Sequence, residues 1–318
     1  MSRPATRGAT GRLLVSSRTA VPHSASLAGG LALAVAGSIA FAGKAIIVKL
    51  AYRYGVDAVT LLMYRMLFAL PFFAFMAWWA GRGQLALTRR DAAGVLWLGF
   101  TGYYLASFLD FAGLQYITAS LERLILYLNP TLVLLLGWLL HGRRIRRPQL
   151  VAMAVSYCGV VLVFGHQLSL EGSAVAWGTL LVFLSTVSYA LYLSYSGELV
   201  HRLGALRLAG LATSVACLLC IAQFALLRPL SAAQVAPPAL WLSLLNAIAC
   251  TALPVLLVMM AIEHIGPALT AQTGMIGPLA TILMGVLILD EPLNHWIIAG
   301  TVLVVAGIFM FSRSARRA

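Results

Sequence analysis

Long apolar stretches recur along the chain, and short polar segments separate them. Within each stretch the apolar residues do not alternate with polar ones, which favours buried helices over strands. A helix needs about 20 apolar residues to cross a bilayer, and lipid admits only helices or closed barrels, because the backbone must satisfy its own hydrogen bonds there. The pattern predicts ten spans, at residues 27–50, 56–80, 92–114, 117–140, 148–166, 173–197, 204–227, 238–261, 265–289 and 293–312.

Composition excludes a soluble protein. Hydrophobic residues occupy 61% of the 318 positions and charged residues only 10%, against about 25% charged residues in an ordinary soluble domain. A soluble fold has no means of covering so much apolar surface, whereas a lipid bilayer accommodates it. We therefore expect an all-α integral membrane protein with ten transmembrane helices.

The formal net charge of +13 is unevenly distributed. With a cytoplasmic N-terminus, sixteen arginines fall in segments on the cytoplasmic side and only Arg53 and Arg228 fall outside. The positive-inside rule accounts for this balance, so a nucleic-acid partner is not expected. Residues 1–26 lack the apolar core of a signal peptide. We expect residues 1–26 and 313–318 to be cytoplasmic tails of a multi-pass protein of the cell inner (plasma) membrane.

The two halves of the chain repeat each other. Residues 116–164 align with residues 264–312, so that Pro130 falls on Pro278 and Gly159 on Gly307, 148 residues later. Residues 27–166 and 173–312 then form two repeats of five spans each. Because five is odd, the repeats must cross the membrane in opposite directions, which is a recurring construction of secondary transporters.

Short motifs within the repeats resemble a known family. The first repeat has the run Ala112–Ser120, then Asn129-Pro130-Thr131 and a basic loop. The second has Ala261–His264, then Gly277-Pro278 and Asp290-Glu291-Pro292-Leu293. These features resemble the EamA-type drug/metabolite transporter superfamily over residues 27–312, although Arg143 stands where that family usually has an acid. The resemblance implies two inverted five-helix halves and, most often, export of amino acids or other small metabolites.

The chain has none of the common motifs of an enzyme or an ATP-driven pump. There is no phosphate-binding loop, no Gly-x-Ser-x-Gly, no His-Glu-x-x-His, and the six histidines are scattered. Cys217-x-x-Cys220 lies in a uniformly apolar span, where cysteines are most often packing residues. We expect no enzymatic activity, no cofactor and no metal, and any energy for transport must come from a gradient.

A charged residue inside a predicted span is costly unless it faces partners or water. Six of them are interpreted as anchors, ion pairs or site residues: Lys44, Lys49, Arg65, Asp110, Glu122 and Arg123. Lys49 is interpreted as an anchor at the outer interface. Arg65 and Asp110 form either a structural ion pair or part of a site. Lys44, Glu122 and Arg123 are candidates for substrate contact or proton coupling. We expect Arg123, with Lys44, to receive a substrate carboxylate, because a guanidinium matches a carboxylate in geometry.

Helical spacing places further polar side chains on the same faces. The predicted cavity wall consists of spans one, three, four, six and nine. The candidate substrate-binding residues are Lys44, Arg65, Tyr103, Ser107, Asp110, Glu122, Arg123, Tyr127, Tyr189, Tyr192, Thr270 and Thr273. The tyrosines and serines of span six are equally compatible with hydrogen bonds between helices. Pro130 and Pro278 each free a backbone carbonyl, which produces either a hinge or a static kink. Asp290 and Glu291 are interpreted as a solvated cap.

These features favour a secondary transporter that exports an amino acid or related carboxylate-bearing metabolite by alternating access. Efflux of cationic or amphipathic drugs, with Glu122 and Asp110 as counter-ions, is an alternative. A non-transporting membrane subunit or sensor is the alternative from another class. The expected partners are a small-molecule substrate and the lipid bilayer; a coupling proton is left open, as is the choice between monomer and homodimer.

Overall fold

The computed structural model describes residues 24–84, 86–142 and 145–316, and within these ranges the ordered elements are all helical. Nine helical segments there are long and apolar enough to cross a membrane, and Gly274–Leu289 is a shorter apolar helix. The first half contains α1 (Ser24–Tyr52), α2 (Ala58–Gly81), α3 (Arg89–Leu98), α4 (Ala106–Gly113), α5 (Ala119–Leu126), α6 (Asn129–His141) and α7 (Arg147–Glu171). The second contains α8 (Ser173–Leu203), α9 (Ala205–Leu227), α10 (Pro237–Ala247), α11 (Leu253–Thr273), α12 (Gly277–Leu289) and α13 (His295–Arg316).

Helix boundaries recur between the two halves. Helices α6 and α12 both begin and end 148 residues apart, and α7 and α13 begin at Arg147 and His295. The turns that end α6 and α12 also match, since Gly142 and Asp290 both adopt the left-handed conformation, with φ of 63° and 59°. The repeat read from the sequence is therefore present in the backbone.

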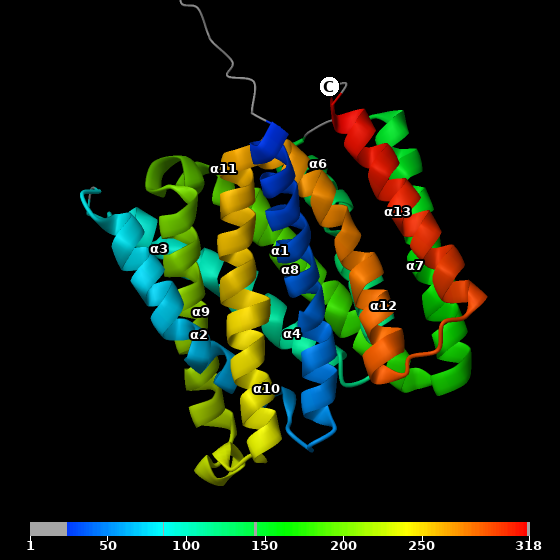
Figure 1. Cartoon of the computed structure of the whole chain (residues 1–318), viewed down its shortest axis with the longest axis horizontal. Coiled ribbons are helices and arrows are strands. Elements are labelled where there is room, and N and C mark those ends of the chain that lie inside the picture. The colour runs from blue at the N-terminus through cyan, green and yellow to red at the C-terminus, as the bar shows by residue number, and fades with distance from the viewer. Residues whose placement is uncertain (1–23, 85, 143–144, 317–318) are drawn as a thin grey trace, which may run out of the picture.

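The packing of the helices shows that the repeats are related by a pseudo-twofold axis. Helix α2 packs against its repeat mate α9, and α7 packs against its mate α13 (Figure 1). Helix α1 packs against α11, and correspondingly α8 packs against α4. Exchange of partners in this way is the signature of an isologous arrangement. The chain is an all-α membrane protein with ten spans in two inverted five-helix repeats.

Glycines bring α7 and α13 into close contact. A Cβ added at Gly159 would lie 2.6 Å from the carbonyl oxygen of Gly300, and one at Gly307 would lie 2.7 Å from that of Ala152. Gly159 and Gly307 are repeat mates, as are Ala152 and Gly300. Small residues are common where two membrane helices pack closely, since they let the backbones approach.

Two spans are broken near their middle. Tyr127 and Leu128 separate α5 from α6, and the 3₁₀ turn Gly274–Ile276 separates α11 from α12. Pro130 and Pro278 fall in the first turn of α6 and α12, where the missing N–H of proline needs no partner. Gly266, with φ of 78°, divides α11 between the eighth and ninth spans.

Two π-helical segments also occupy equivalent places in the repeats. Gly99–Leu105 joins α3 to α4, and Ile248–Ala252 joins α10 to α11. Such segments insert an extra residue per turn and are frequent at functional sites. Both segments line the cavity described below.

The start of α1 and the end of α13 lie at the same end of the bundle (Figure 1). We name this the tail end and the other the far end. Large apolar side chains point outward along the length of the bundle, as at Leu139, Leu226 and Leu287. This is the surface that lipid would cover.

Candidate functional site

A cavity of about 810 Å³ lies between the two repeats. Its lining residues nearest the far end include Lys44, Arg65 and Asp110. From there the lining continues toward the tail end, to Ala209 near the start of α9 and Phe311 near the end of α13. The cavity is therefore a deep chamber with a charged inner wall and a route toward the tail end.

Eight of the twelve predicted binding residues line this cavity: Lys44, Arg65, Tyr103, Ser107, Asp110, Arg123, Tyr127 and Tyr189. Glu122, Tyr192, Thr270 and Thr273 are not among the lining residues. Pro130 lines the cavity at the break before α6, whereas Pro278 is buried away from the lining.

The described lining residues differ from the predicted wall in one respect. Span nine contributes none of the described lining residues; instead α2, α9, the junction of α10 with α11, and α13 complete the wall. The hydroxyls of Thr270 and Thr273 donate to the carbonyls of Gly266 and Leu269, one turn back in their own helix. The turn at Gly266 and the 3₁₀ break at Gly274 change the direction of this segment, so an unbroken helical wheel misplaces its faces.

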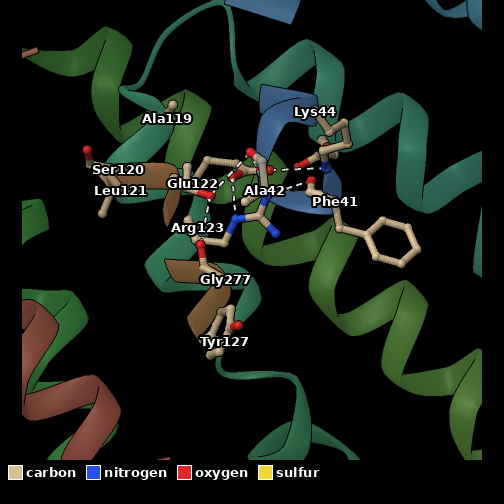
Figure 2. Close-up of polar contacts among 12 residues, drawn as sticks. Phe41, Ala42, Lys44, Ala119, Ser120, Leu121, Glu122, Arg123, Tyr127 and Gly277 are labelled. Atoms are coloured by element: carbon tan, nitrogen blue, oxygen red, sulfur yellow. Dashed lines mark hydrogen bonds and ion pairs between the residues drawn. The ribbon is translucent and has the colours of Figure 1, made fainter. Parts of the chain in front are cut away.

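An ionic cluster lies at the charged wall (Figure 2). Lys44 on α1 places its Nζ 2.6 Å from Oδ2 of Asp110 on α4 and 3.1 Å from Oε1 of Glu122 on α5. Glu122 Oε2 lies 3.8 Å from Nε of Arg123. Glu122 is 0% exposed, and a buried charge persists only when it is paired. Lys44 thus holds three helices of the first repeat together.

Arg123 and Tyr127 extend the cluster toward other helices. Nη2 of Arg123 donates to the carbonyl oxygens of Phe41 at 3.3 Å and Ala42 at 3.4 Å (Figure 2). The hydroxyl of Tyr127 donates to the carbonyl of Gly274 at 2.9 Å, and the same carbonyl accepts from the backbone N–H of Gly277 at the break before α12. Arg123 therefore joins α5 to α1, and Tyr127 joins the first repeat to the second.

Arg65 does not pair with Asp110. Asp110 pairs with Lys44, and no ion pair to Arg65 occurs among the described residues. Instead Nε of Arg65 donates to Oγ1 of Thr251 at 3.1 Å, and its guanidinium lies 5.2 Å from the ring centroid of Phe111. Of the two alternatives considered for Arg65 and Asp110, the direct ion pair does not form among the described residues, and Asp110 pairs with Lys44 instead.

Lys49 is not a free anchor at the membrane surface. Its Nζ donates to the carbonyl oxygen of Ile117 at 2.8 Å and lies 3.4 Å from that of Leu114. The segment after α4 leaves these carbonyls without helical partners, and a cation there satisfies them.

Glu291 is buried, contrary to the solvated cap that we expected. It is 8% exposed, and its carboxylate accepts hydrogen bonds from the backbone N–H of Ala119 at 2.6 Å and of Ser120 at 3.2 Å. The Ser120 hydroxyl adds a third bond at 2.7 Å. A carboxylate at a helix N-terminus satisfies orphan N–H groups and favours the helix dipole. Asp290 is exposed, as expected.

The polar stripe of α8 serves both of the roles considered for it. Ser185 and Ser188 donate to the carbonyls of Ala106 and Thr101, so they join α8 to the third span. The hydroxyls of Tyr103 and Tyr192 lie 3.2 Å apart, and Tyr189 stacks on Tyr192 with centroids 5.4 Å apart. Tyr103 and Tyr189 face the cavity, with Tyr192 behind them.

Comparison with known proteins identifies the chain. The sequence pattern of the EamA-like transporter family matches residues 28–165 and, a second time, residues 176–313. The chain belongs to this family. It is a multi-pass membrane transporter of the drug/metabolite type.

Individual relatives and a solved structure agree with this assignment. Uncharacterized transporter YcbK of Bacillus subtilis (strain 168) is 29% identical over 275 residues, which cover 84% of this chain and 87% of YcbK. Uncharacterized transporter YetK of the same organism is 25% identical over 290 residues, covering 88% of this chain and 84% of YetK. One crystal structure covers 91% of this chain and 98% of its own, with a TM-score of 0.61 at 18% identity, which shows a shared fold.

The repeat explains several cavity residues of this EamA-like transporter that helical spacing alone did not find. Missed lining residues include Phe41, Thr213, Cys250 and Thr251. Phe41, Thr213 and Thr251 are the repeat mates of Tyr189, Arg65 and Tyr103, which were predicted. Cys250 is the mate of Gly102, which also lines the cavity. Applying the offset of the repeat to each candidate would have located Phe41, Thr213 and Thr251, because a pseudo-twofold site uses equivalent positions from both halves.

Proposed function

We propose that the chain is a secondary transporter that exports an amino acid or a related carboxylate-bearing metabolite by alternating access. The observation that supports this most strongly is the charge of the cavity wall. Three cations, Lys44, Arg65 and Arg123, lie there with the carboxylate of Asp110, and Glu122 lies behind the wall in contact with Lys44. One positive charge is in excess, and a substrate carboxylate balances it in a region where unpaired charge is costly.

The rest of the cavity fits a small amphipathic molecule. A volume of about 810 Å³ falls in the range of about 300–1,000 Å³ that holds small molecules. Aromatic and aliphatic side chains, including Phe41, Phe73, Leu126 and Val133, cover the wall away from the charges. One carboxylate oxygen of Asp110, Oδ1, is buried without a hydrogen-bond partner among the described residues, so it is suited to accept a bond from a substrate ammonium.

The position of the cavity supports loading from the cytoplasm. Its lining reaches the tail end of the bundle, and the positive-inside rule assigns that end to the cytoplasm. At the far end, Lys49 and Glu291 hold the α4–α5 segment in place. The two inverted repeats then exchange their arrangements to open the opposite side, as the symmetry of such transporters allows.

Efflux of cationic drugs is the second candidate, and Asp110 and Glu122 are its expected counter-ions. Both carboxylates are already paired with Lys44, and the five charged groups together carry one positive charge, which disfavours a substrate that is only cationic. A non-transporting subunit or sensor is the candidate from another class, and it predicts binding without movement of substrate.

Counterflow in proteoliposomes separates these candidates. Vesicles are loaded with each proteinogenic amino acid or with its decarboxylated amine, and uptake of the labelled compound is followed with and without a pH gradient. We expect saturable counterflow of one or more amino acids above that of protein-free vesicles, and little counterflow of the matched amines. Exchange of amines alone would favour drug efflux, and binding without exchange would favour the sensor.

A further inference from the structure

We propose that Arg65, oriented by Thr251, is the residue that receives the substrate carboxylate. This assignment rests on the proposed transport of carboxylate-bearing substrates, and it replaces the expected pair of Arg123 and Lys44. It concerns one guanidinium group on the wall of the cavity, in α2 of the first repeat.

Among the described cations that line the cavity, Arg65 alone makes no ion pair. Lys44 contacts the carboxylates of both Asp110 and Glu122. Arg123 contacts Glu122 and two backbone carbonyls of α1. Lys44 and Arg123 therefore each have a carboxylate of the protein within 4 Å, although Nε of Arg123 has no hydrogen-bond partner among the described residues. Arg65 has no such carboxylate in the described part of the chain, so we assign the excess positive charge of the wall to it.

The guanidinium of Arg65 also has an unused donor. Arg65 is 8% exposed, and its Nη1 is buried with no hydrogen-bond partner in the part of the chain that the structure describes. A buried charged donor without an acceptor is strongly disfavoured, and a carboxylate that enters the cavity supplies that acceptor. Lysine and arginine are not equivalent here, since only the planar guanidinium can bind two carboxylate oxygens side by side.

Three contacts set the orientation of this group. The ring of Phe111, which is fully buried, lies beneath the guanidinium at 5.2 Å. Thr251 accepts from Nε at 3.1 Å, and its own hydroxyl donates to the carbonyl of Asn246 at 2.9 Å. Because Nε is held in this way, Nη1 is left for a ligand. Thr251 is a positioning residue that acts through Arg65.

This arrangement joins the two repeats at the binding group. Arg65 belongs to the first repeat, whereas Thr251 lies in the π-helical segment of the second. Any movement of one repeat against the other changes the Arg65–Thr251 contact. The affinity for the carboxylate is thereby linked to the relative position of the two halves.

The test compares each amino acid with its own primary amide, which has an uncharged carboxamide in place of the carboxylate. Binding of the twenty proteinogenic amino acids and their amides is measured on the purified full-length chain. The variants are Arg65→Gln, Arg65→Lys, Thr251→Val, Thr251→Ser and Arg123→Gln. Arg228→Gln, which changes an exposed arginine outside the cavity, is the control for charge removal.

We expect the parent to bind at least one amino acid at least tenfold more tightly than its amide. Arg65→Gln should lose that preference, with the amide bound within threefold of the parent. Arg65→Lys should lose most of it, and Thr251→Val should reduce it about tenfold while Thr251→Ser keeps it. A merely structural role for Thr251 predicts instead that the acid and the amide weaken together.

The outcomes distinguish this inference from the proposed function. If the parent binds no amino acid, the proposed function fails. If the parent prefers the acid and Arg65→Gln keeps that preference, the inference is overturned while the function stands. If Arg123→Gln loses the preference and Arg65→Gln keeps it, the carboxylate is received by Arg123 with Lys44, as the sequence predicted. If Arg65→Gln folds poorly, the test rests on Thr251→Val, which retains every charge of the cavity. An unchanged preference for the acid over the amide in Thr251→Val overturns the inference.

Discussion

Glu291 accepts a hydrogen bond of 2.6 Å from the backbone N–H of Ala119, although 172 residues separate them along the chain. Glu291 follows α12 in the second repeat, and Ala119 begins α5 in the first. The position equivalent to Glu291 in the first repeat is Arg143, which has the opposite charge and lies outside the described residues. A carboxylate cap of this kind is therefore encoded at only one of the two equivalent positions.

Removing this cap should loosen the start of α5 at the far end. We expect Glu291→Ala to lower the free energy of unfolding by about 1–3 kcal/mol, since it leaves buried N–H groups of α5 without acceptors. The same variant should increase labelling of a cysteine at Ser107 in the cavity by a membrane-impermeant thiol reagent added outside intact cells. The measurements are thermal unfolding in detergent and the rate of labelling.

Asp290→Asn is the matched control for that experiment. Asp290 precedes Glu291 in the chain, and its side chain is exposed. Its backbone adopts the left-handed conformation, which asparagine tolerates well. The control should match the parent in both measurements. If Glu291→Ala is as stable as Asp290→Asn and no more reactive, the contact does not hold the far end closed.

Gly159 and Gly165 should respond in opposite ways to the same substitution. A methyl group at Gly159 would lie 2.6 Å from the carbonyl oxygen of Gly300, whereas Gly165 has nothing within 4 Å of the equivalent point. Gly159→Ala should therefore destabilise the α7–α13 pair by about 1–3 kcal/mol, the usual cost of overpacking. Gly165→Ala should be neutral or stabilising by up to about 1 kcal/mol, because alanine is the better helix former.

Unfolding in a denaturing detergent provides the measurement for this pair. Both glycines lie in α7, so the two variants share the same helix and the same lipid environment. Equal midpoints for the two variants would contradict the close approach of α7 and α13 at Gly159.

The fold was largely predictable because it depends on local properties of the sequence. The length of each apolar stretch determines a span, and Pro130 and Pro278 fall at the same place in both repeats and favour the first turn of a helix, so the breaks could be placed within a few residues. The repeat was visible because both halves need the same breaks and the same close-packed glycines, as at Gly159 and Gly307.

The pairings within the site were less predictable because they depend on distances between helices. The sequence identified Lys44, Asp110, Glu122 and Arg65 as charged residues in the spans, but not that Lys44 would bridge both carboxylates. Glu291 appeared solvated, because its partner at Ala119 lies in the other repeat. Spacing along a helix shows which side chains share a face, and it cannot show which other helix that face meets.

The orientation in the membrane is testable at two exposed loops. The charge distribution places residue 145 in the cytoplasm and the loop before α10 outside. In a cysteine-free background, Ile145→Cys should resist an impermeant thiol reagent in intact cells and react after lysis, whereas Ser231→Cys should react in both. Labelling of position 145 in intact cells would show that the predicted orientation is wrong.

The last prediction concerns coupling to protons through the cluster around Lys44. Glu122 is 0% exposed and lies behind the cavity wall, whereas Asp110 lines it. Lys44 lies within 3.1 Å of both carboxylates, so a proton gained by either one weakens its hold on the lysine. If transport uses protons, Asp110 and Glu122 are the acids, among the described residues, that are placed to take up and release a proton as the cavity opens to one side and then the other. We expect Glu122→Gln to abolish accumulation driven by a pH gradient while substrate counterflow continues, since counterflow needs no net proton movement.

Asp110→Asn tests the other carboxylate, and Glu263→Gln, which neutralises an exposed acid, serves as the control. Asp110→Asn should also reduce counterflow, because Asp110 faces the substrate whereas Glu122 does not. The control should accumulate substrate as the parent does. If both Glu122→Gln and Asp110→Asn retain full gradient-driven accumulation, protons do not pass through this cluster. If the parent itself shows no dependence on the pH gradient, the buried carboxylates serve only to hold Lys44 and the three helices that meet there.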